Sequence, residues 1–280
     1  MTHDEDTIEA FFCPSRILIE KSVTDKPGKR RGGKQKTGDE EIGYFDWLAP
    51  NYELLEPIVD PTRLQAHSVL LDILNAIEPA PENVLDLGCG NGMLTSQILE
   101  LLPGVHVYAI DGSLAMLTAA RENLDEFSGQ VTLAKADFRD AWEDVIEEPI
   151  DVIVHYNSLH HLPHEALREV YTRLVKVLRP GGWFLHGDST EERLPDPVRR
   201  IATNIRNVQT QSAITDLCGN KELLEEFDRI RRQSEAKGQL TETPAMPEQQ
   251  ISWLIEAGFE FASRVYHDWH VSIFIARKPE

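Results

Sequence analysis

Apolar and polar residues alternate in a regular rhythm from about residue 84 to residue 188. Short apolar runs of the kind that parallel sheets bury on both faces alternate with segments whose apolar residues recur every three or four positions, as on one helix face. The runs predict strands at 84–87, 105–110, 131–133, 150–154 and 183–185. The segments between them predict helices at 93–102, at 164–178 and after Ser113, whose side chain suits a helix N-cap.

The rhythm differs on either side of this region. A helical stripe covers 61–77 and stops at two prolines, whereas 190–243 is polar and helix-prone with no strand candidate. A helix at 247–257 and two half-buried strands at 259–266 and 270–277, joined by a tight turn, close the sequence. The order predicts an α/β fold: a doubly wound, seven-strand, mostly parallel sheet with an inserted helical cap.

The same pattern predicts how the 280 residues are divided. We expect a flexible N-terminal arm over 1–40, in which 8–19 forms a short helix or strand, and a single domain over 41–280. Within that domain, 41–80 would form N-terminal lid helices, and 190–243 would form the cap. A chain of this length is sufficient for one large α/β domain with such an addition.

Composition narrows the cellular setting. No apolar run reaches the roughly 18 residues of a membrane span, and the acidic start of the chain does not look like a secretory signal. The three cysteines, Cys13, Cys89 and Cys218, have neither metal-site spacing nor an even disulfide framework. We therefore expect a cytoplasmic protein without a metal site.

Charge narrows the partners. The net charge of −19 repels polyphosphates, so no nucleic acid is expected as a partner. One basic segment at 21–36 stands out among glycines, and it is interpreted as a solvated linker or as a small arm that contacts an acidic partner. The oligomeric state stays open, with a dimer among the alternatives.

The most informative chemistry follows the first strand of the regular region. Gly88, Gly90 and Gly92 stand at every second position between this strand and the next helix. Glycine at such a turn permits positive φ and lets a ligand lie against bare main chain. The amides that open the following helix are then expected to face the ligand. The run predicts a nucleotide-type cofactor site.

Three acidic positions bear on which cofactor is held. The dinucleotide fingerprint G-x-G-x-x-G requires a third glycine at the position of Met93, and Asp86 precedes the first glycine instead. Asp111 ends the second strand, where a carboxylate accepts hydrogen bonds from ribose hydroxyls of NAD or of other adenosine cofactors. Asp137 and Phe138 follow the third strand, where a carboxylate can accept from an adenine amino group and an aromatic ring can support its face.

Together with the segments 157–162 and 178–182, these motifs resemble the class I S-adenosylmethionine-dependent methyltransferases over residues 44–188. The stretch 44–52 is similar to the entrance of the quinone-type and small-molecule members, where it folds over the cofactor. The resemblance implies the strand order 3-2-1-4-5-7-6. It also implies a cofactor site in which Asp86, Gly88, Cys89 and Gly90 hold the methionine end, Asp111, Gly112 and Met116 the ribose, Asp137 and Phe138 the adenine, and His155 or Tyr156 lies under the sulfonium, with Tyr44 or Tyr52 as a lid.

The implied reaction is methyl transfer from S-adenosylmethionine to a small or medium organic acceptor, which yields S-adenosylhomocysteine. If the nucleophile must lose a proton, the candidate bases are His160, His161, His186 and Asp188. Packing or helix capping is the competing interpretation of the histidine pair. Tyr266 and Trp269 in the last hairpin can line an acceptor pocket, although its turn residues are expected to be exposed. The alternatives are an NAD-dependent oxidoreductase, and a catalytically silent cofactor-binding module that acts through partners.

Overall fold

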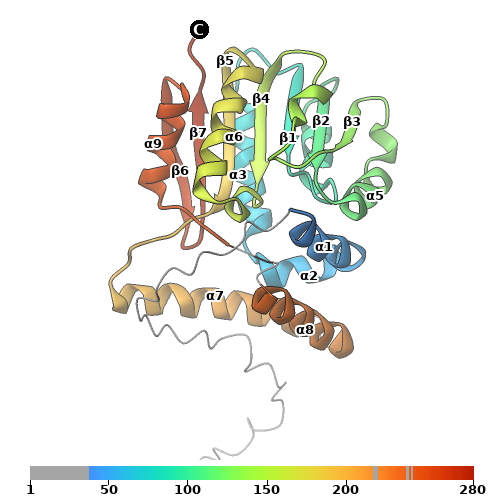
Figure 1. Cartoon of the computed structure of the whole chain (residues 1–280), viewed down its shortest axis with the longest axis vertical. Helices are drawn as coiled ribbons and strands as arrows, with labels where there is room; N and C mark the ends of the chain where they lie inside the picture. The colour runs from blue at the N-terminus through green and yellow to red at the C-terminus, as the bar shows by residue number, and fades with distance from the viewer. Residues whose placement is uncertain (1–37, 217–219, 238–239, 241) are drawn as a thin grey trace, which may run out of the picture. The chain divides into compact units, whose positions relative to one another are not determined.

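The computed structural model describes residues 38–216, 220–237, 240 and 242–280 (Figure 1). The basic segment 21–36, the element expected at 8–19, Cys13 and Cys218 lie outside the described residues. A seven-stranded sheet with the order β3-β2-β1-β4-β5-β7-β6 carries the fold. Its strands are β1 (Asn83–Leu87), β2 (His106–Asp111), β3 (Val131–Lys135), β4 (Ile150–Tyr156), β5 (Leu178–Ser189), β6 (Phe261–Asp268) and β7 (Val271–Arg277).

The strand directions confirm the predicted topology. β1 pairs in parallel with β2 and β4, and the parallel pairing continues to β3 on one side and to β5 on the other. Only β7 runs antiparallel to its two neighbours, β5 and β6. The carboxyl ends of β1 to β5 therefore meet along one edge of the sheet, which is where ligands of open α/β sheets bind.

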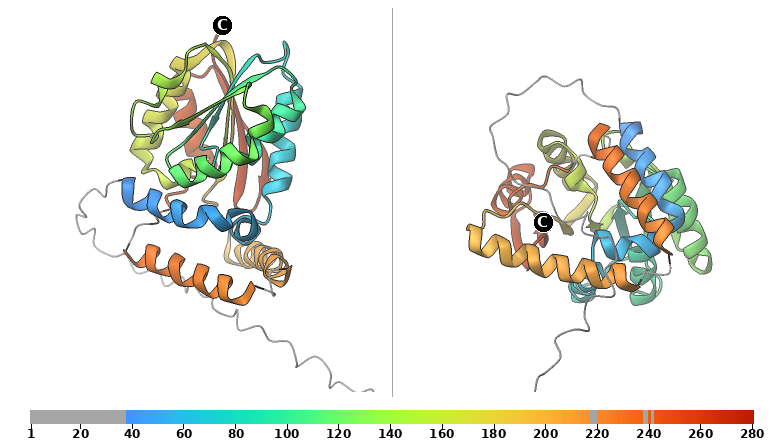
Figure 2. Two further views of the ribbon diagram at one scale, coloured as in Figure 1. Left: turned by 90° about the vertical axis from the view of Figure 1, so that its right-hand side faces the viewer. Right: turned by 90° about the horizontal axis from the view of Figure 1, so that it is seen from below.

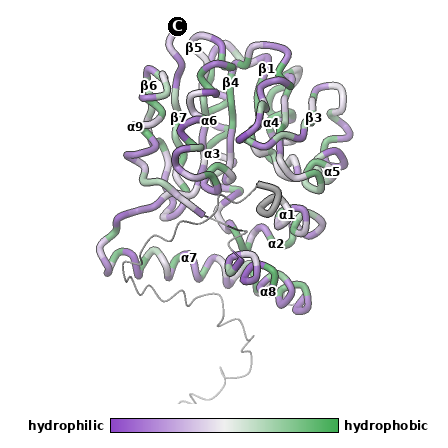
Figure 3. Tube along the Cα trace, in the orientation of Figure 1, coloured by the Kyte–Doolittle hydropathy of each residue, from purple (hydrophilic) through white to green (hydrophobic). Residues whose placement is uncertain are grey.

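Helices cover both faces of this sheet, as doubly wound folds require (Figure 2). α3 (Arg63–Asn75), α4 (Met93–Leu101) and α5 (Leu114–Asn123) bury their apolar sides against one face. α6 (His164–Val177) and α9 (Pro247–Ala257) bury theirs against the other. Figure 3 shows the hydrophobic run of β4 between these layers, and every residue of that strand is buried.

Local signals set several element ends as the sequence predicts. The Ser113 hydroxyl caps α5 by accepting a hydrogen bond from the Met116 amide at 3.1 Å. Gly258 ends α9 in the left-handed conformation, with φ of 114°. The segment 179–182 lies between the predicted helix at 164–178 and the predicted strand at 183–185, and it belongs to β5, which extends back to Leu178 alongside Ile150 of β4.

A separate group of helices lies at the carboxyl edge of the sheet. α1 (Gly38–Leu48), a 3₁₀ turn (Ala49–Asn51) and α2 (Tyr52–Val59) come from the N-terminal region, and α7 (Asp196–Asp216) and α8 (Lys221–Lys237) come from the 190–243 segment. Leu55 and Ile58 pack with Ile214 and Phe227 in one apolar cluster. Figure 2 shows α8 beyond α1 and α2, on the side away from the sheet.

α3 differs from the other helices of the 41–80 region because Ala66, Leu70 and Leu74 pack it on the sheet.

None of the helices in the described ranges is both long and apolar enough to cross a membrane.

Candidate functional site

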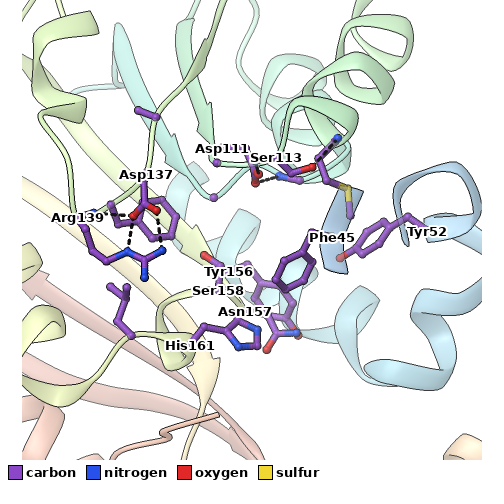
Figure 4. A pocket seen from close by; sticks show the side chains of 17 residues that line it. Phe45, Tyr52, Asp111, Ser113, Asp137, Arg139, Tyr156, Asn157, Ser158 and His161 are labelled. Atoms are coloured by element: carbon purple, nitrogen blue, oxygen red, sulfur yellow. Dashed lines mark hydrogen bonds and ion pairs between the residues drawn. The ribbon is translucent and has the colours of Figure 1, made fainter. Parts of the chain in front are cut away.

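A pocket opens where the carboxyl ends of β1, β2, β3 and β4 meet α1 and α2 (Figure 4). It encloses about 780 Å³, including its open mouth. Ten of the residues predicted from the sequence line it: Tyr52, Gly88, Gly90, Asp111, Gly112, Met116, Asp137, Phe138, Tyr156 and His161. We call it the first pocket.

The glycine turn forms one wall of the first pocket. Gly88 has φ of 86°, and a Cβ atom built there would lie 2.3 Å from Ser158 Oγ and 3.2 Å from Phe138 Cζ. The Gly88 and Cys89 amides donate to the Ile110 carbonyl, and the Met93 amide lies 3.4 Å from Asn91 Oδ1. The hydrogen bonds of the Gly88 and Cys89 amides therefore shape the turn itself, and the expectation that the amides opening the next helix face a ligand stays a prediction.

Asp111 joins the turn to the second strand. Its Oδ2 accepts from the Gly90 amide at 2.9 Å, and its Oδ1 accepts from the Ser113 amide at 2.8 Å. Burial raises the pKa of Asp111, and the hydrogen bonds from backbone amides act in the opposite direction. The two amides thus fix the carboxyl group at the pocket wall. Each of its oxygens can still accept a further hydrogen bond.

Asp137 and Phe138 line the far end of the first pocket. The Asp137 carboxylate accepts from Arg139 Nε at 2.7 Å and Nη2 at 2.6 Å, a pairing that the sequence interpretation did not include (Figure 4). Burial by itself raises the pKa of Asp137, but the Arg139 hydrogen bonds and charge outweigh it and lower the pKa. Asp137 therefore stays ionised at neutral pH.

Only one of the two residues proposed to lie under the sulfonium reaches the pocket. Tyr156 lines the first pocket, and its hydroxyl donates to Asp60. His155 points to the other side of β4 and is fully buried. His155 and Tyr156 face opposite sides of the sheet because β4 continues to Tyr156, and successive side chains on a strand point to opposite faces.

Aromatic side chains from the N-terminal helices close the first pocket on one side. Phe45 on α1 and Tyr52 on α2 line it, and the Phe45 ring meets the His161 ring edge-on at 5.4 Å (Figure 4). Of the two tyrosines considered for a lid, Tyr52 is therefore at the pocket. Tyr44 is buried in the apolar cluster beneath it instead.

A smaller hollow shares Tyr52, Gly88, Gly90 and Tyr156 with the first pocket, and we call it the side hollow. Its lining adds Asp86, Cys89, Asn91, Met93, Leu94 and two residues of α3, Arg63 and His67.

Asp86, Arg63 and Cys89 of the side hollow differ in their environments. Burial raises the pKa of Asp86 to about 7, although Thr95 Oγ1 donates to it at 2.5 Å. The Arg63 guanidinium lies 2.9 Å from Glu56. The Cys89 thiol packs with Ala109 and Leu117, so the side chain serves the core and only the backbone of Cys89 belongs to the turn.

A second pocket adjoins the first through Asn157, which lines both. It encloses about 870 Å³ between the α2–α3 turn, the ends of β4 and β5, α7, α8 and the β6–β7 hairpin. Its charged and imidazole side chains are those of Asp60, His160, Arg206, Arg231, Glu242, Asp268 and His270. The hairpin turn also contributes Trp269, one of the two aromatic residues that the sequence suggested for an acceptor pocket.

His160 and Asp188 form a buried pair at this second pocket. His160 Nδ1 lies 2.6 Å from Asp188 Oδ1, and the two side chains are 8% and 2% exposed. Burial by itself raises the pKa of Asp188, but the His160 charge and hydrogen bond lower it well below the usual range. Both residues were predicted from the sequence as candidate bases, but their pairing was not.

His186 belongs to a different network beneath the pockets. The Ser158 and Leu159 amides donate to His155 Nε2, so Nδ1 of His155 carries the proton and donates to His186 Nδ1 at 2.9 Å. His186 Nε2 then donates to Gln250 Oε1 at 2.8 Å. Although ligand atoms of His155, His186 and Asp188 lie within 4.8 Å of one another, these hydrogen bonds already use both histidines. His186 is fully buried, which removes it from the candidate bases.

Comparison with known proteins places this architecture in a family. The sequence model of the family described as "Methyltransferase domain" matches residues 84–182. An uncharacterized methyltransferase of Oceanobacillus iheyensis is 32% identical over 156 residues, covering 55% of this chain and 70% of that protein. A trans-aconitate 2-methyltransferase of Acidovorax sp. (strain JS42) is 33% identical over 138 residues, covering 49% of this chain and 48% of the relative.

Solved structures share the fold. The N-methyltransferase NodS from Bradyrhizobium japonicum WM9, in complex with S-adenosylhomocysteine, superposes with a TM-score of 0.58 at 18% identity, covering 86% of this chain and 100% of that one. A DhpI–SAH complex gives 0.57 at 17% identity, covering 86% and 97%. The chain belongs to the class I S-adenosylmethionine-dependent methyltransferase family, as the sequence predicted. It spans about half of the length of the trans-aconitate relatives it matches.

Proposed function

We propose that the protein transfers a methyl group from S-adenosylmethionine to a small organic acceptor and releases S-adenosylhomocysteine. The observation that carries the proposal is the convergence of Gly88, Asp111 and Asp137 on one pocket, which adjoins a second pocket at Asn157. A donor site and an acceptor site that meet at one residue are what a group transfer requires. Family membership supports the same reaction.

The lining residues fit this cofactor. At Gly90, where φ is 53°, a Cβ atom would meet no atom within 4 Å, so a ligand can lie against bare main chain there. Asp111 would accept from the ribose hydroxyls beside Gly112 and Met116, and Phe138 would support the adenine ring near Asp137. Gly90 and the backbone of Cys89 would flank the methionyl chain. In the side hollow, Asp86 suits the methionyl ammonium and Arg63 suits its carboxylate.

The protein's own contribution is to position the reactants and to exclude water. When bound, the cofactor supplies an electrophilic methyl group on a positive sulfonium, and its leaving thioether is neutral. No oxyanion stabilisation is therefore needed from the chain. Orientation of two well-placed groups contributes up to roughly 7–11 kcal/mol to lowering the barrier. Phe45, Tyr52 and Tyr156 would enclose the reacting groups, because all three side chains line the first pocket.

A general base is needed only when the acceptor atom is a hydroxyl or a protonated amine. For those acceptors, we propose that His160 accepts the proton, because it lines the second pocket and its Nδ1 lies 2.6 Å from Oδ1 of the ionised Asp188. His161 lies in the first pocket against Phe45 and would contact the cofactor side. His160→Gln is then expected to lower kcat without changing the affinity for S-adenosylhomocysteine. His106→Gln is the control and should change neither quantity, because His106 begins β2, at the end of the strand away from the pockets.

The acceptor is proposed to be a small molecule, and the acidic chain is proposed to act in the cytoplasm without nucleic acid partners. The relatives named as trans-aconitate 2-methyltransferases act on a small organic acid, which supports an acceptor of that size. The oligomeric state, including a dimer, does not enter the proposed chemistry, since the described residues of one chain line both pockets.

Isothermal titration calorimetry with S-adenosylmethionine, S-adenosylhomocysteine and NAD tests the cofactor. We expect the first two to bind and NAD not to bind. Binding of NAD alone would support an oxidoreductase and overturn the proposal. Incubation with methyl-labelled S-adenosylmethionine and a small-molecule extract tests the reaction, since a catalytically silent binding module would label no acceptor.

A further inference from the structure

The side chains that line the second pocket indicate the class of its ligand. We propose that the methyl acceptor is a small organic acid whose carboxylate group pairs with Arg206, the guanidinium that α7 presents to the pocket beside the cofactor site. The inference rests on the proposed methyl transfer and specifies the class of its acceptor.

Arg206 is a largely buried cation that makes no direct salt bridge with the described carboxylates. Its Nη2 donates to the Val59 carbonyl at 3.4 Å, and among the described residues no carboxylate lies within ion-pair distance of its guanidinium. Burial lowers the pKa of Arg206 and the charge of Arg231 lowers it further, whereas the charges of Asp60 and Glu242 act in the opposite direction. A buried guanidinium of this kind is stabilised by a bound anion, and its planar fork matches a carboxylate.

The groups around Arg206 respond to its charge. His270 lines the same pocket, and burial together with the Arg206 and His267 charges lowers the pKa of His270 to about 4. His270 is therefore neutral at pH 7 and adds no positive charge. Arg231, across the pocket, is already engaged, because its Nε lies 3.2 Å from Glu235 Oε1 and its Nη2 lies 3.9 Å from Glu242 Oε1. Arg206 is thus the cationic side chain of this pocket that an anionic ligand would pair with.

Three acidic side chains in the pocket restrict the ligand to a single negative charge near Arg206. Asp60 accepts from Tyr156 and Thr62, Glu242 faces Arg231, and Asp268 stands on the hairpin. Their summed charge repels a dianionic phosphate more strongly than a monoanionic carboxylate. The same oxygens can accept hydrogen bonds from a hydroxyl or amino group elsewhere on the acid.

The remaining walls suit a short carbon skeleton that leads to the cofactor. Val59, Pro61 and Trp269 give apolar surface to the second pocket. Asn157 stands at the junction with the first pocket and has φ of 55°, an uncommon conformation for a residue other than glycine. An acid anchored at Arg206 would therefore extend its nucleophilic atom toward Asn157, where a cofactor methyl group would enter.

The test uses the full chain and a small-molecule cell extract that is split on an anion-exchange resin at pH 7. Methyl-labelled S-adenosylmethionine reports transfer to each fraction, and part of the retained fraction is first treated with alkaline phosphatase. We expect transfer to the retained fraction, unchanged by phosphatase. Arg206→Met should lower kcat/KM for the retained acceptor roughly 10- to 100-fold, the scale of a lost charged hydrogen bond.

The control variant is Arg200→Met, because Arg200 lies on the same helix but is exposed and outside the pocket. It should leave transfer unchanged, and Arg206→Lys should retain part of it. Equal affinity of Arg206→Met and the natural chain for S-adenosylhomocysteine shows that the variant is folded. Transfer to the unretained fraction, loss of transfer after phosphatase, or full activity of Arg206→Met would overturn the acceptor class. Absence of S-adenosylhomocysteine binding by the natural chain would instead overturn the proposed function.

Discussion

Three aspartates predicted from one motif set have three different environments. Asp86 is buried with its pKa raised to about 7, Asp111 ties two backbone amides together, and Asp137 is ion-paired to Arg139. The sequence predicts that each follows a strand or stands within it, since apolar runs mark the strands. It does not predict their partners. Whether the side chains of Thr95 and Arg139 reach the carboxylates of Asp86 and Asp137 depends on the conformation of the backbone between them.

Asp111→Ala should weaken S-adenosylhomocysteine binding by roughly 1–3 kcal/mol, because it removes a carboxylate acceptor for the ribose. Calorimetric titration measures the change. Asp125→Ala is the matched control, since Asp125 is exposed and outside the lining of both pockets. Asp111→Asn separates the two roles of the residue, as it keeps one oxygen for the turn amides but loses the charge. Unchanged affinity of the alanine variant would remove Asp111 from the ribose site.

Asp86 gives cofactor affinity a dependence on pH. Its raised pKa means that the free protein holds a neutral carboxyl group below about pH 7 and a carboxylate above it. The ligand ammonium pairs with the carboxylate, so the affinity for S-adenosylhomocysteine should rise between pH 6 and pH 8 and level off above that. Titrations at several pH values measure this, and Asp86→Asn should flatten the curve. A variant that keeps the full pH dependence would contradict the assignment.

At the scale of elements, the site depends on two turns that meet. The turn after β1 carries Gly88, and the turn after β4 carries Ser158, whose Oγ is held by His155 Nε2 at 2.8 Å. The strand order brings these turns together because β1 and β4 are neighbours. Glycine spacing in the sequence predicts the first turn, whereas the polar residues of the second give no comparable signal, since its conformation comes from the buried histidine beneath it.

Gly88→Ala should disrupt this contact. The new Cβ would lie 2.3 Å from Ser158 Oγ, which the hydrogen bond to His155 keeps from moving aside. Gly104→Ala is the control, since Gly104 also has positive φ, at 92°, but has no atom within 4 Å of the new Cβ. We expect Gly88→Ala to be less stable than Gly104→Ala by roughly 1–3 kcal/mol in urea unfolding and to lose cofactor binding. Equal stability and intact binding would contradict the packing.

At the scale of the whole described domain, helices from two distant parts of the sequence cover one edge of the sheet. α1 and α2 face the first pocket through Phe45 and Tyr52, and α7 and α8 pack on their outer side. The helix pattern predicts that these segments are helical. It does not predict that Arg206 and Arg231 face the ends of β4 and β5, because helical periodicity alone does not choose the neighbour of each face.

S-adenosylhomocysteine should therefore slow amide hydrogen exchange in α1 and α2 more than in the rest of the domain. A ligand enclosed by Phe45 and Tyr52 stabilises the closed arrangement of these helices and reduces their local opening. Exchange measured by mass spectrometry, with and without the ligand, tests this. α9 is the internal control, because it packs on the sheet through Leu254 and contributes no residue to either pocket. Equal protection of α9 would indicate general stabilisation instead.

The sequence by itself determined the parallel sheet, the glycine turn and the family, because these depend on local hydrophobic periodicity and on residue types at fixed spacing. The start of β5, over 179–182, was not predicted as a strand, because it depends on the alignment of β5 with β4. Only the tertiary structure decided that His160 lies against Asp188, that His155 is absent from the lining of the first pocket, and that Arg206 lines the second pocket. These contacts join residues far apart in the chain, and their energies depend on burial that no local pattern contains.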